Sequence, residues 1–131
     1  MIAGDGPISW TSIADLGLAS ALVLVDSIGK FEGKTFYLAS LETRTLRDVA
    51  RIVSEVKGPE IEAKVTGKDE YVEYYVGSGR ERSSAEWWVS SYEALKRGEC
   101  EIQDTTFSEL LGARGTKPKP VEEGIREMLA G

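Results

Sequence analysis

The chain has 131 residues, which is enough for one compact domain and too few for two ordinary ones. It carries 16 Lys and Arg against 22 Asp and Glu, and the resulting formal net charge of −6 argues against binding to a nucleic-acid backbone. Histidine is absent and Cys100 is the single cysteine, so a His-dependent triad, a His-containing zinc site and an intrachain disulfide are excluded.

The first part of the chain is predicted to contain a turn, a short strand and a helix. Residues 4–7 (GDGP) are turn formers, and residues 8–11 follow as a strand candidate. Ser12 begins a helix that runs to about Val25, and Asp15 is its partner in a capping box. Apolar residues lie nearly all round this helix, so we expect it to be largely buried.

The next part has the pattern strand, helix, strand. Residues 34–40 (KTFYLAS) have strand chemistry. Thr45 and Asp48 form a second capping box, at the start of an amphipathic helix that ends at Gly58. Residues 61–65 alternate apolar and charged side chains, which is typical of a half-buried strand.

The remainder is predicted to be mainly helical. The expected segments are helices at 69–76, 84–97 and 121–129, a helical turn at 108–111 and an extended segment at 101–106. The order β-α-β-α-β followed by helices predicts the α/β (α+β) class, with a short sheet of about three strands and four to five helices. We expect residues 1–131 to form a single domain.

Two glycine pairs raise the question of nucleotide binding. Gly4 with Gly6, and Gly77 with Gly79, match the start of the G-x-G-x-x-G motif of dinucleotide-binding turns. The third glycine is missing in both cases, and neither pair joins a predicted strand to a helix, where amides would meet a pyrophosphate. Both pairs are therefore interpreted as turns.

Aromatic residues crowd into one region and form the candidate ligand site. They are Tyr71, Tyr74, Tyr75, Trp87, Trp88 and Tyr92. At helical spacing, core packing is one interpretation of several of them. The alternative is the wall of a pocket for a flat, partly apolar ligand, because Tyr and Trp join apolar area to a polar group. The neighbouring residues 80–82 (RER) are interpreted as a solvated loop.

Four stretches of the sequence resemble one known family. They are GDGPISWTSIADLGLASALVLVD (4–26), GKTFYLASLETRTLRDVARIVSEVKG (33–58), KDEYVEYYVGSG (68–79) and SELLGARGTKPKPVEEGIREMLA (108–130). In this order and spacing they resemble NmrA-like proteins, the atypical short-chain dehydrogenases. The resemblance covers nearly the whole chain and is strongest to fungal metabolic members.

The resemblance is to the C-terminal half of the family only, the lobe that closes over the substrate. It implies that the glycine-rich turn and most of the NAD(P) site belong to an N-terminal half that these residues do not match. The Tyr-x-x-x-Lys pair of short-chain dehydrogenases would also lie upstream. Tyr92 and Lys96 reproduce its spacing, but on the wrong helix, so we interpret that match as chance.

Three functions follow from this resemblance. The first is a dinucleotide-independent enzyme of polyketide or alkaloid metabolism that catalyses a cyclisation, dehydration or isomerisation through positioning and one acid or base. The second is an NAD(P)H-dependent reductase whose nucleotide-binding half is supplied by another chain. The third is a non-catalytic metabolite-binding or regulatory protein.

The expected site lies between the helices at 71–76 and 84–97. Tyr75 is the candidate catalytic proton donor, and the candidate substrate-binding residues are Trp10 as the floor with Tyr71, Trp88 and Tyr92 as walls. We expect a small-molecule substrate, no metal, and no cofactor unless a second chain brings NAD(P)H. A homodimer, a cytoplasmic location and no membrane or nucleic-acid partner are also expected.

Overall fold

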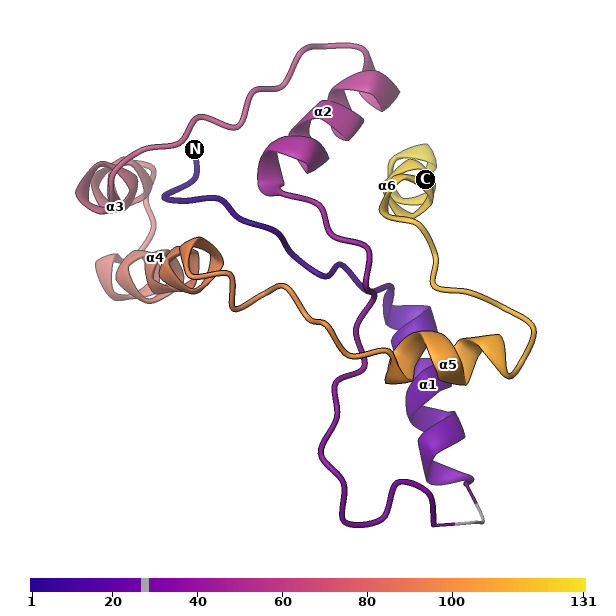
Figure 1. Ribbon diagram of the computed structural model, residues 1–131. Coiled ribbons are helices and arrows are strands. Elements are labelled where there is room, and N and C mark those ends of the chain that lie inside the picture. The colour runs from indigo at the N-terminus through magenta and orange to yellow at the C-terminus, as the bar shows by residue number, and fades with distance from the viewer. Residues whose placement is uncertain (27–28) are drawn as a thin grey trace. The chain divides into compact units, whose positions relative to one another are not determined.

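The computed structural model describes residues 1–26 and 29–131, and within these ranges helices are joined by extended segments (Figure 1). The helices are α1 (Ile13–Leu24), α2 (Leu46–Lys57), α3 (Lys68–Gly77), α4 (Arg82–Lys96), α5 (Thr106–Gly112) and α6 (Val121–Ala130). Each helix expected from the sequence is present, with ends that differ by a few residues. None of these helices has both the length and the apolar content needed to cross a bilayer.

The predicted sheet is absent from the described residues, so the α/β (α+β) prediction with about three strands is wrong. Two isolated bridges take its place: a parallel one between Ile2 and Val65 and an antiparallel one between Ile8 and Arg44. The parallel bridge is made by the Ile2 amide, which donates to Lys64 at 2.9 Å, and by the Ile2 carbonyl, which accepts from the amide of residue 66 at 2.8 Å.

The predicted strand segments are extended, but several of their amides bond to side chains. Within residues 34–40, the amide of Tyr37 donates to the carboxylate of Asp104 at 2.8 Å. The amide of Ile61 donates in the same way to the hydroxyl of Ser54, also at 2.8 Å. A strand needs the backbone of a neighbour as well as suitable residue types, and the residue types are all that the sequence pattern reported.

The chain divides into two compact units, each made from two stretches. Unit 1 comprises Met1–Ile8 and Arg44–Cys100, and unit 2 comprises Ser9–Thr43 and Glu101–Gly131. Each unit has its own buried apolar cluster. The single domain expected over residues 1–131 stays a prediction.

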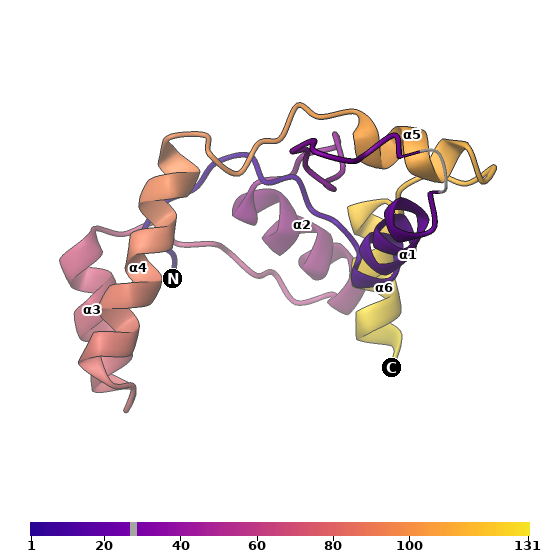
Figure 2. The same cartoon turned by 90° about the horizontal axis from the view of Figure 1, so that it is seen from below.

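The core of unit 1 forms where α3 and α4 lie side by side, as both views of the ribbon show (Figures 1 and 2). Side chains from both helices and from the N-terminal stretch fill it: Ala3, Tyr71, Val72, Ala85, Val89, Tyr92 and Leu95. Burying an aliphatic side chain as completely as Val89 contributes about 1.5–3 kcal/mol. This packing fixes the two helices that carry the aromatic residues.

The turn at residues 4–6 connects the N-terminal stretch to α2 within unit 1. The carboxylate of Asp5 accepts hydrogen bonds from the amides of Leu46 at 2.8 Å and Arg47 at 3.3 Å. A helix leaves its first amides unpaired, and negative charge is favourable at that end. Asp5 therefore adds to the capping box of Thr45 and Asp48, which is confirmed in both directions.

In unit 2, α1 and α5 cross in contact (Figure 1). Ala19 of α1 and Phe107 and Leu111 of α5 are completely buried at this contact. The prediction that α1 is largely buried is wrong, because Ala19 is its one buried residue and Ile13 is 88% exposed. Apolar residues lie nearly all round α1, but one face of the helix packs against α5. Much of its remaining surface is not covered by the described residues.

Candidate functional site

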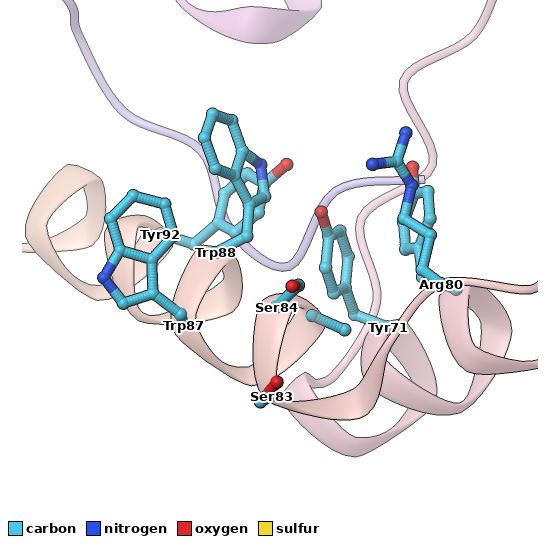
Figure 3. Close-up of a pocket in the computed structure, with 9 residues that line it drawn as sticks. Tyr71, Arg80, Ser83, Ser84, Trp87, Trp88 and Tyr92 are labelled. Carbon is cyan, nitrogen blue, oxygen red and sulfur yellow. The ribbon is translucent and has the colours of Figure 1, made fainter.

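Unit 1 contains a pocket of about 700 Å³ between α3 and α4 (Figure 3). Residues of both helices and of the segment between them line it: Tyr71, Tyr75, Arg80, Ser83, Ser84, Ala85, Trp87, Trp88 and Tyr92. Its volume lies in the range of small-molecule sites, and its lining combines aromatic area with a few polar groups. The pocket is therefore the candidate functional site.

Helical spacing brings the aromatic rings together. Tyr71 and Tyr75 are one turn apart on α3, with ring centroids 4.5 Å apart. Tyr71 also meets Tyr92 of α4 edge-on, with centroids 5.3 Å apart. Such tilted and edge-to-face pairs are worth about 0.5–1.5 kcal/mol beyond the area that they bury. These ring pairs thus stabilise the aromatic wall of the pocket and the contact between α3 and α4.

The two interpretations of the aromatic group each apply to some of its members. Tyr71 and Tyr92 are 4% and 8% exposed and belong to the core, although both also line the pocket. Trp87 and Trp88 are 72% and 54% exposed, with ring centroids 5.8 Å apart. Large apolar rings at such exposure are available to a ligand.

The hydroxyl of Tyr71 points into the space of the pocket (Figure 3). Burial, followed by hydrogen bonding with the Tyr92 hydroxyl, raises the pKa of Tyr71 well above its ordinary value. Tyr71 therefore stays protonated at any physiological pH. It can take part in hydrogen bonding at the pocket, but it is a weaker acid than an ordinary tyrosine.

Tyr75, the predicted proton donor, is half-buried and lines the pocket. Its hydroxyl donates to the carbonyl oxygen of Met1 at 3.4 Å, which is a long hydrogen bond. Trp10, the predicted floor, is in unit 2 and is not one of the residues that line this pocket. The catalytic role of Tyr75 and the binding roles of the others stay predictions.

Arg80 lines the pocket, although the charges of residues 80–82 indicate a solvated loop in the sequence. Gly79, with a φ of +90°, ends α3 in the left-handed conformation that glycine permits. The Arg80 amide then donates back to the carbonyl of Tyr75 at 3.0 Å, the long-range bond of a Schellman motif. This turn places the Arg80 guanidinium 6.0 Å from the centre of the Tyr75 ring.

Ser83 and Ser84 add hydroxyl groups to the pocket from the first turn of α4. Neither hydroxyl has a hydrogen-bond partner within residues 1–26 and 29–131. The helix expected from the sequence begins at residue 84. The start of α4 at Arg82 instead leaves both of them inside the helix with their hydroxyls available.

Neither glycine pair fits the pyrophosphate of a dinucleotide. Gly6 packs against the backbone of Leu95, so α4 covers the turn at residues 4–6. The amide of Gly6 donates to the Asp5 carboxylate. Gly79 belongs to the C-terminal end of α3, where carbonyls rather than amides are unpaired. A pyrophosphate needs several amides at a helix N-terminus, and neither glycine pair provides them.

No protein-family model matches the chain. Over 128 residues it is 28% identical to flvB, an NmrA-like family domain-containing oxidoreductase of Aspergillus flavus, covering 95% of this chain and 40% of that protein. The triphenylmethane reductase of Citrobacter sp., solved with NADP(H), is 27% identical with a TM-score of 0.82, covering 95% of this chain and 42% of that one.

A third similarity concerns the fold alone. The NADPH complex of the Escherichia coli quinone oxidoreductase QOR2 has a TM-score of 0.84 at 22% identity, covering 98% of this chain and 44% of that one. The chain thus spans less than half the length of each of these proteins. These similarities confirm the resemblance inferred from the sequence: over nearly its whole length, the chain is similar to the C-terminal part of an NmrA-like protein of the atypical short-chain dehydrogenase class.

Proposed function

We propose that the chain supplies the substrate-binding part of an NADPH-dependent oxidoreductase, with the nucleotide held by residues outside these 131. The observation that carries the proposal is the similarity of 95% of the chain to an NmrA-like oxidoreductase. The similarity to a reductase solved with NADP(H) supports it, since the two share 27% identity. The substrate is reduced by the complete enzyme, and the role of this chain is to bind and orient it.

This proposal replaces the first of the three functions drawn from the sequence. A cyclisation, dehydration or isomerisation receives no support from flvB or the triphenylmethane reductase, both of which are named as oxidoreductases or reductases. The comparisons favour the second function, the reductase with a complementing nucleotide site. The third, a non-catalytic binding protein, is an outcome of the test below.

The pocket of unit 1 supports the proposal because it suits a flat aromatic substrate. Trp88 offers an exposed indole, and Tyr71 a buried ring whose hydroxyl faces the same space. Each ring that stacks against an aromatic wall gains about 0.5–1.5 kcal/mol beyond area burial. Tyr75 lines the same pocket, where its hydroxyl can reach a bound substrate once it leaves Met1.

Two measurements on the purified chain test the binding half of the proposal. Calorimetric titration with a naphthoquinone, a flat and neutral electron acceptor, should show saturable binding in the micromolar to millimolar range. Titration with NADPH should show none at low-micromolar concentration, since neither glycine pair presents its amides to a pyrophosphate at a helix N-terminus. Tight NADPH binding by the chain alone would overturn the proposal that residues outside these 131 hold the nucleotide.

A chimera tests the catalytic half. In it, the 131 residues replace the matching C-terminal part of flvB, and flvB without that part is the control. The chimera should oxidise NADPH only when the naphthoquinone is present, and the truncated control should not. A chimera that folds and binds both NADPH and the quinone, yet oxidises no NADPH, would favour the non-catalytic function.

A further inference from the structure

The pocket between α3 and α4 has one charged side chain among its nine lining residues, and that side chain is a cation. Arg80 provides it, while the other eight residues are aromatic, serine or alanine. The whole chain carries a net charge of −6. A cation that is the single charge of an aromatic pocket creates a local attraction for anions even though the protein as a whole is acidic.

No carboxylate of the described residues lies within ion-pair distance of Arg80. Arg82, two residues along the chain, instead pairs with Glu73 at 2.8 Å and Glu86 at 4.0 Å. Among residues 1–26 and 29–131, the Arg80 guanidinium lies against the Tyr75 ring and donates no hydrogen bond. Its five N–H donors are therefore free to bind a ligand.

The arrangement around Arg80 has the components of a two-point site. Figure 3 shows Arg80 and Trp88 on opposite sides of Tyr71, whose hydroxyl points between them. The hydroxyls of Ser83 and Ser84, without partners among the described residues, lie at the same pocket. A ring placed against Trp88 can thus direct an oxygen atom toward the guanidinium, with hydroxyl groups beside it.

We propose that this pocket selects aromatic ligands that carry an anionic oxygen, a carboxylate or an ionised phenol, and that Arg80 is the residue that determines this selectivity. A guanidinium donates two parallel hydrogen bonds to the two oxygens of a carboxylate, and its charge favours the oxygen of an ionised phenol over a neutral or cationic group. The proposal deepens the proposed function, on which it rests, by naming the charge of the substrate.

The selectivity is moderate and depends on salt. Arg80 is exposed, so water and ions screen its charge. We expect 2-naphthoate to bind roughly three- to tenfold more tightly than 2-naphthamide, its neutral analogue of the same shape. The cationic 2-naphthylmethylammonium should bind more weakly than both. The preference for naphthoate should shrink as salt is raised through the physiological range.

Calorimetric titration of these three probes into the wild-type chain and three variants tests the proposal. Arg80→Gln should make naphthoate and naphthamide bind equally. Arg97→Gln removes the same charge at the far end of α4, where Arg97 pairs with Glu99, and should leave the preference intact. Arg80→Lys should keep part of the preference, because an ammonium attracts an anion without the bidentate geometry.

The possible outcomes separate this inference from the function that underlies it. Equal binding of naphthoate and naphthamide to the wild-type chain would overturn the anion selectivity and leave an aromatic pocket in place. An equal loss of preference in Arg80→Gln and Arg97→Gln would also overturn it, because net charge would then be the cause. Failure of every probe, the naphthoquinone included, would overturn both the inference and the proposed pocket.

Discussion

Gly6 lies directly against the backbone of Leu95, so that a methyl group added at position 6 would overlap the Leu95 carbonyl oxygen. That carbonyl accepts a hydrogen bond from the Gly98 amide at 3.0 Å, where α4 ends, and it cannot move aside without disturbing the end of the helix. The N-terminal stretch therefore approaches α4 as closely as it does only because residue 6 has no side chain.

Gly6→Ala should lower the stability of the chain by about 1–3 kcal/mol, the usual cost of forcing an extra carbon into a packed contact. Urea denaturation followed by circular dichroism measures this change. Gly17→Ala is the matched control: Gly17 is inside α1 with no heavy atom within 4 Å of an added Cβ. That substitution should stabilise by about 0.5–1 kcal/mol. Equal stabilities of the two variants would contradict the close approach.

The capping box of α2 offers a second stability test. The Thr45 hydroxyl accepts from the Asp48 amide at 3.1 Å, and the Asp48 carboxylate accepts from the Thr45 amide at 2.9 Å. Thr45→Ala should cost about 1 kcal/mol, and Thr45→Ser should be near neutral because serine keeps the hydroxyl. Denaturation midpoints of the three proteins give the comparison. A serine variant as weak as the alanine variant would assign the effect to the lost methyl group.

Asp48 also makes stability depend on pH. The hydrogen bond from the Thr45 amide, followed by that from its hydroxyl, lowers the pKa of Asp48 in the folded chain. A lowered pKa stabilises the fold above the ordinary carboxyl pKa, and this contribution is lost as pH falls through the lowered value. Asp48→Asn should therefore lose stability near pH 7 and show a shallower decline toward acid than the wild type. If the free energy of unfolding of the variant and the wild type declined equally as pH falls, this expectation would be contradicted.

Comparison of two similar caps shows what the sequence could and could not predict. Thr45 and Asp48 form a complete box, as their spacing predicted. Ser12 and Asp15 have the same spacing, and the Ser12 hydroxyl accepts from the Asp15 amide at 3.1 Å. The Asp15 carboxylate, however, accepts from the amide of Lys119 at 2.7 Å. Local spacing predicts local hydrogen bonds, and it cannot detect a partner 104 residues away.

The same limit explains the candidate site. Four-residue spacing was enough to place Tyr71 with Tyr75 and Trp88 with Tyr92 on shared helix faces, because that relation is built into the helix. The position of Arg80 depends on how α3 ends. The three consecutive charges of residues 80–82 indicated instead a loop that faces solvent. Gly79 followed by Arg80 is a recognisable Schellman pattern. This pattern predicts that the chain turns back after α3 and brings Arg80 toward Tyr75.

Two aromatic substitutions should separate binding from catalysis. Trp88→Ala removes an exposed ring from the pocket wall and should weaken naphthoquinone binding by about three- to tenfold. Tyr75→Phe keeps the ring but removes the hydroxyl, so it should spare binding and lower NADPH oxidation by the flvB chimera. Tyr74→Phe, on the same helix but outside the pocket lining, is the control. If all three variants match the wild type, the rings serve packing alone.

Self-association of the chain is expected from the exposed side of α1. Ile13, Leu24 and Val25 are 88%, 84% and 71% exposed, at or beside the two ends of one helix. Exposed apolar side chains on this scale favour pairing, and a two-fold dimer is the simplest closed arrangement of identical chains. We therefore expect the homodimer that the sequence suggested, formed through α1.

Light scattering at micromolar concentration tests this expectation. The wild-type chain should have the mass of a dimer, and the double variant Ile13→Gln, Leu24→Gln should dissociate at least in part, because burying each leucine-sized side chain contributes about 1.5–3 kcal/mol. Neither residue is buried, so the substitutions should leave the circular dichroism spectrum unchanged. Met128→Gln removes a side chain 75% exposed on α6 and should leave the dimer intact. A wild-type monomer would contradict the expectation, and a dimer that survives the double variant would place its interface away from α1.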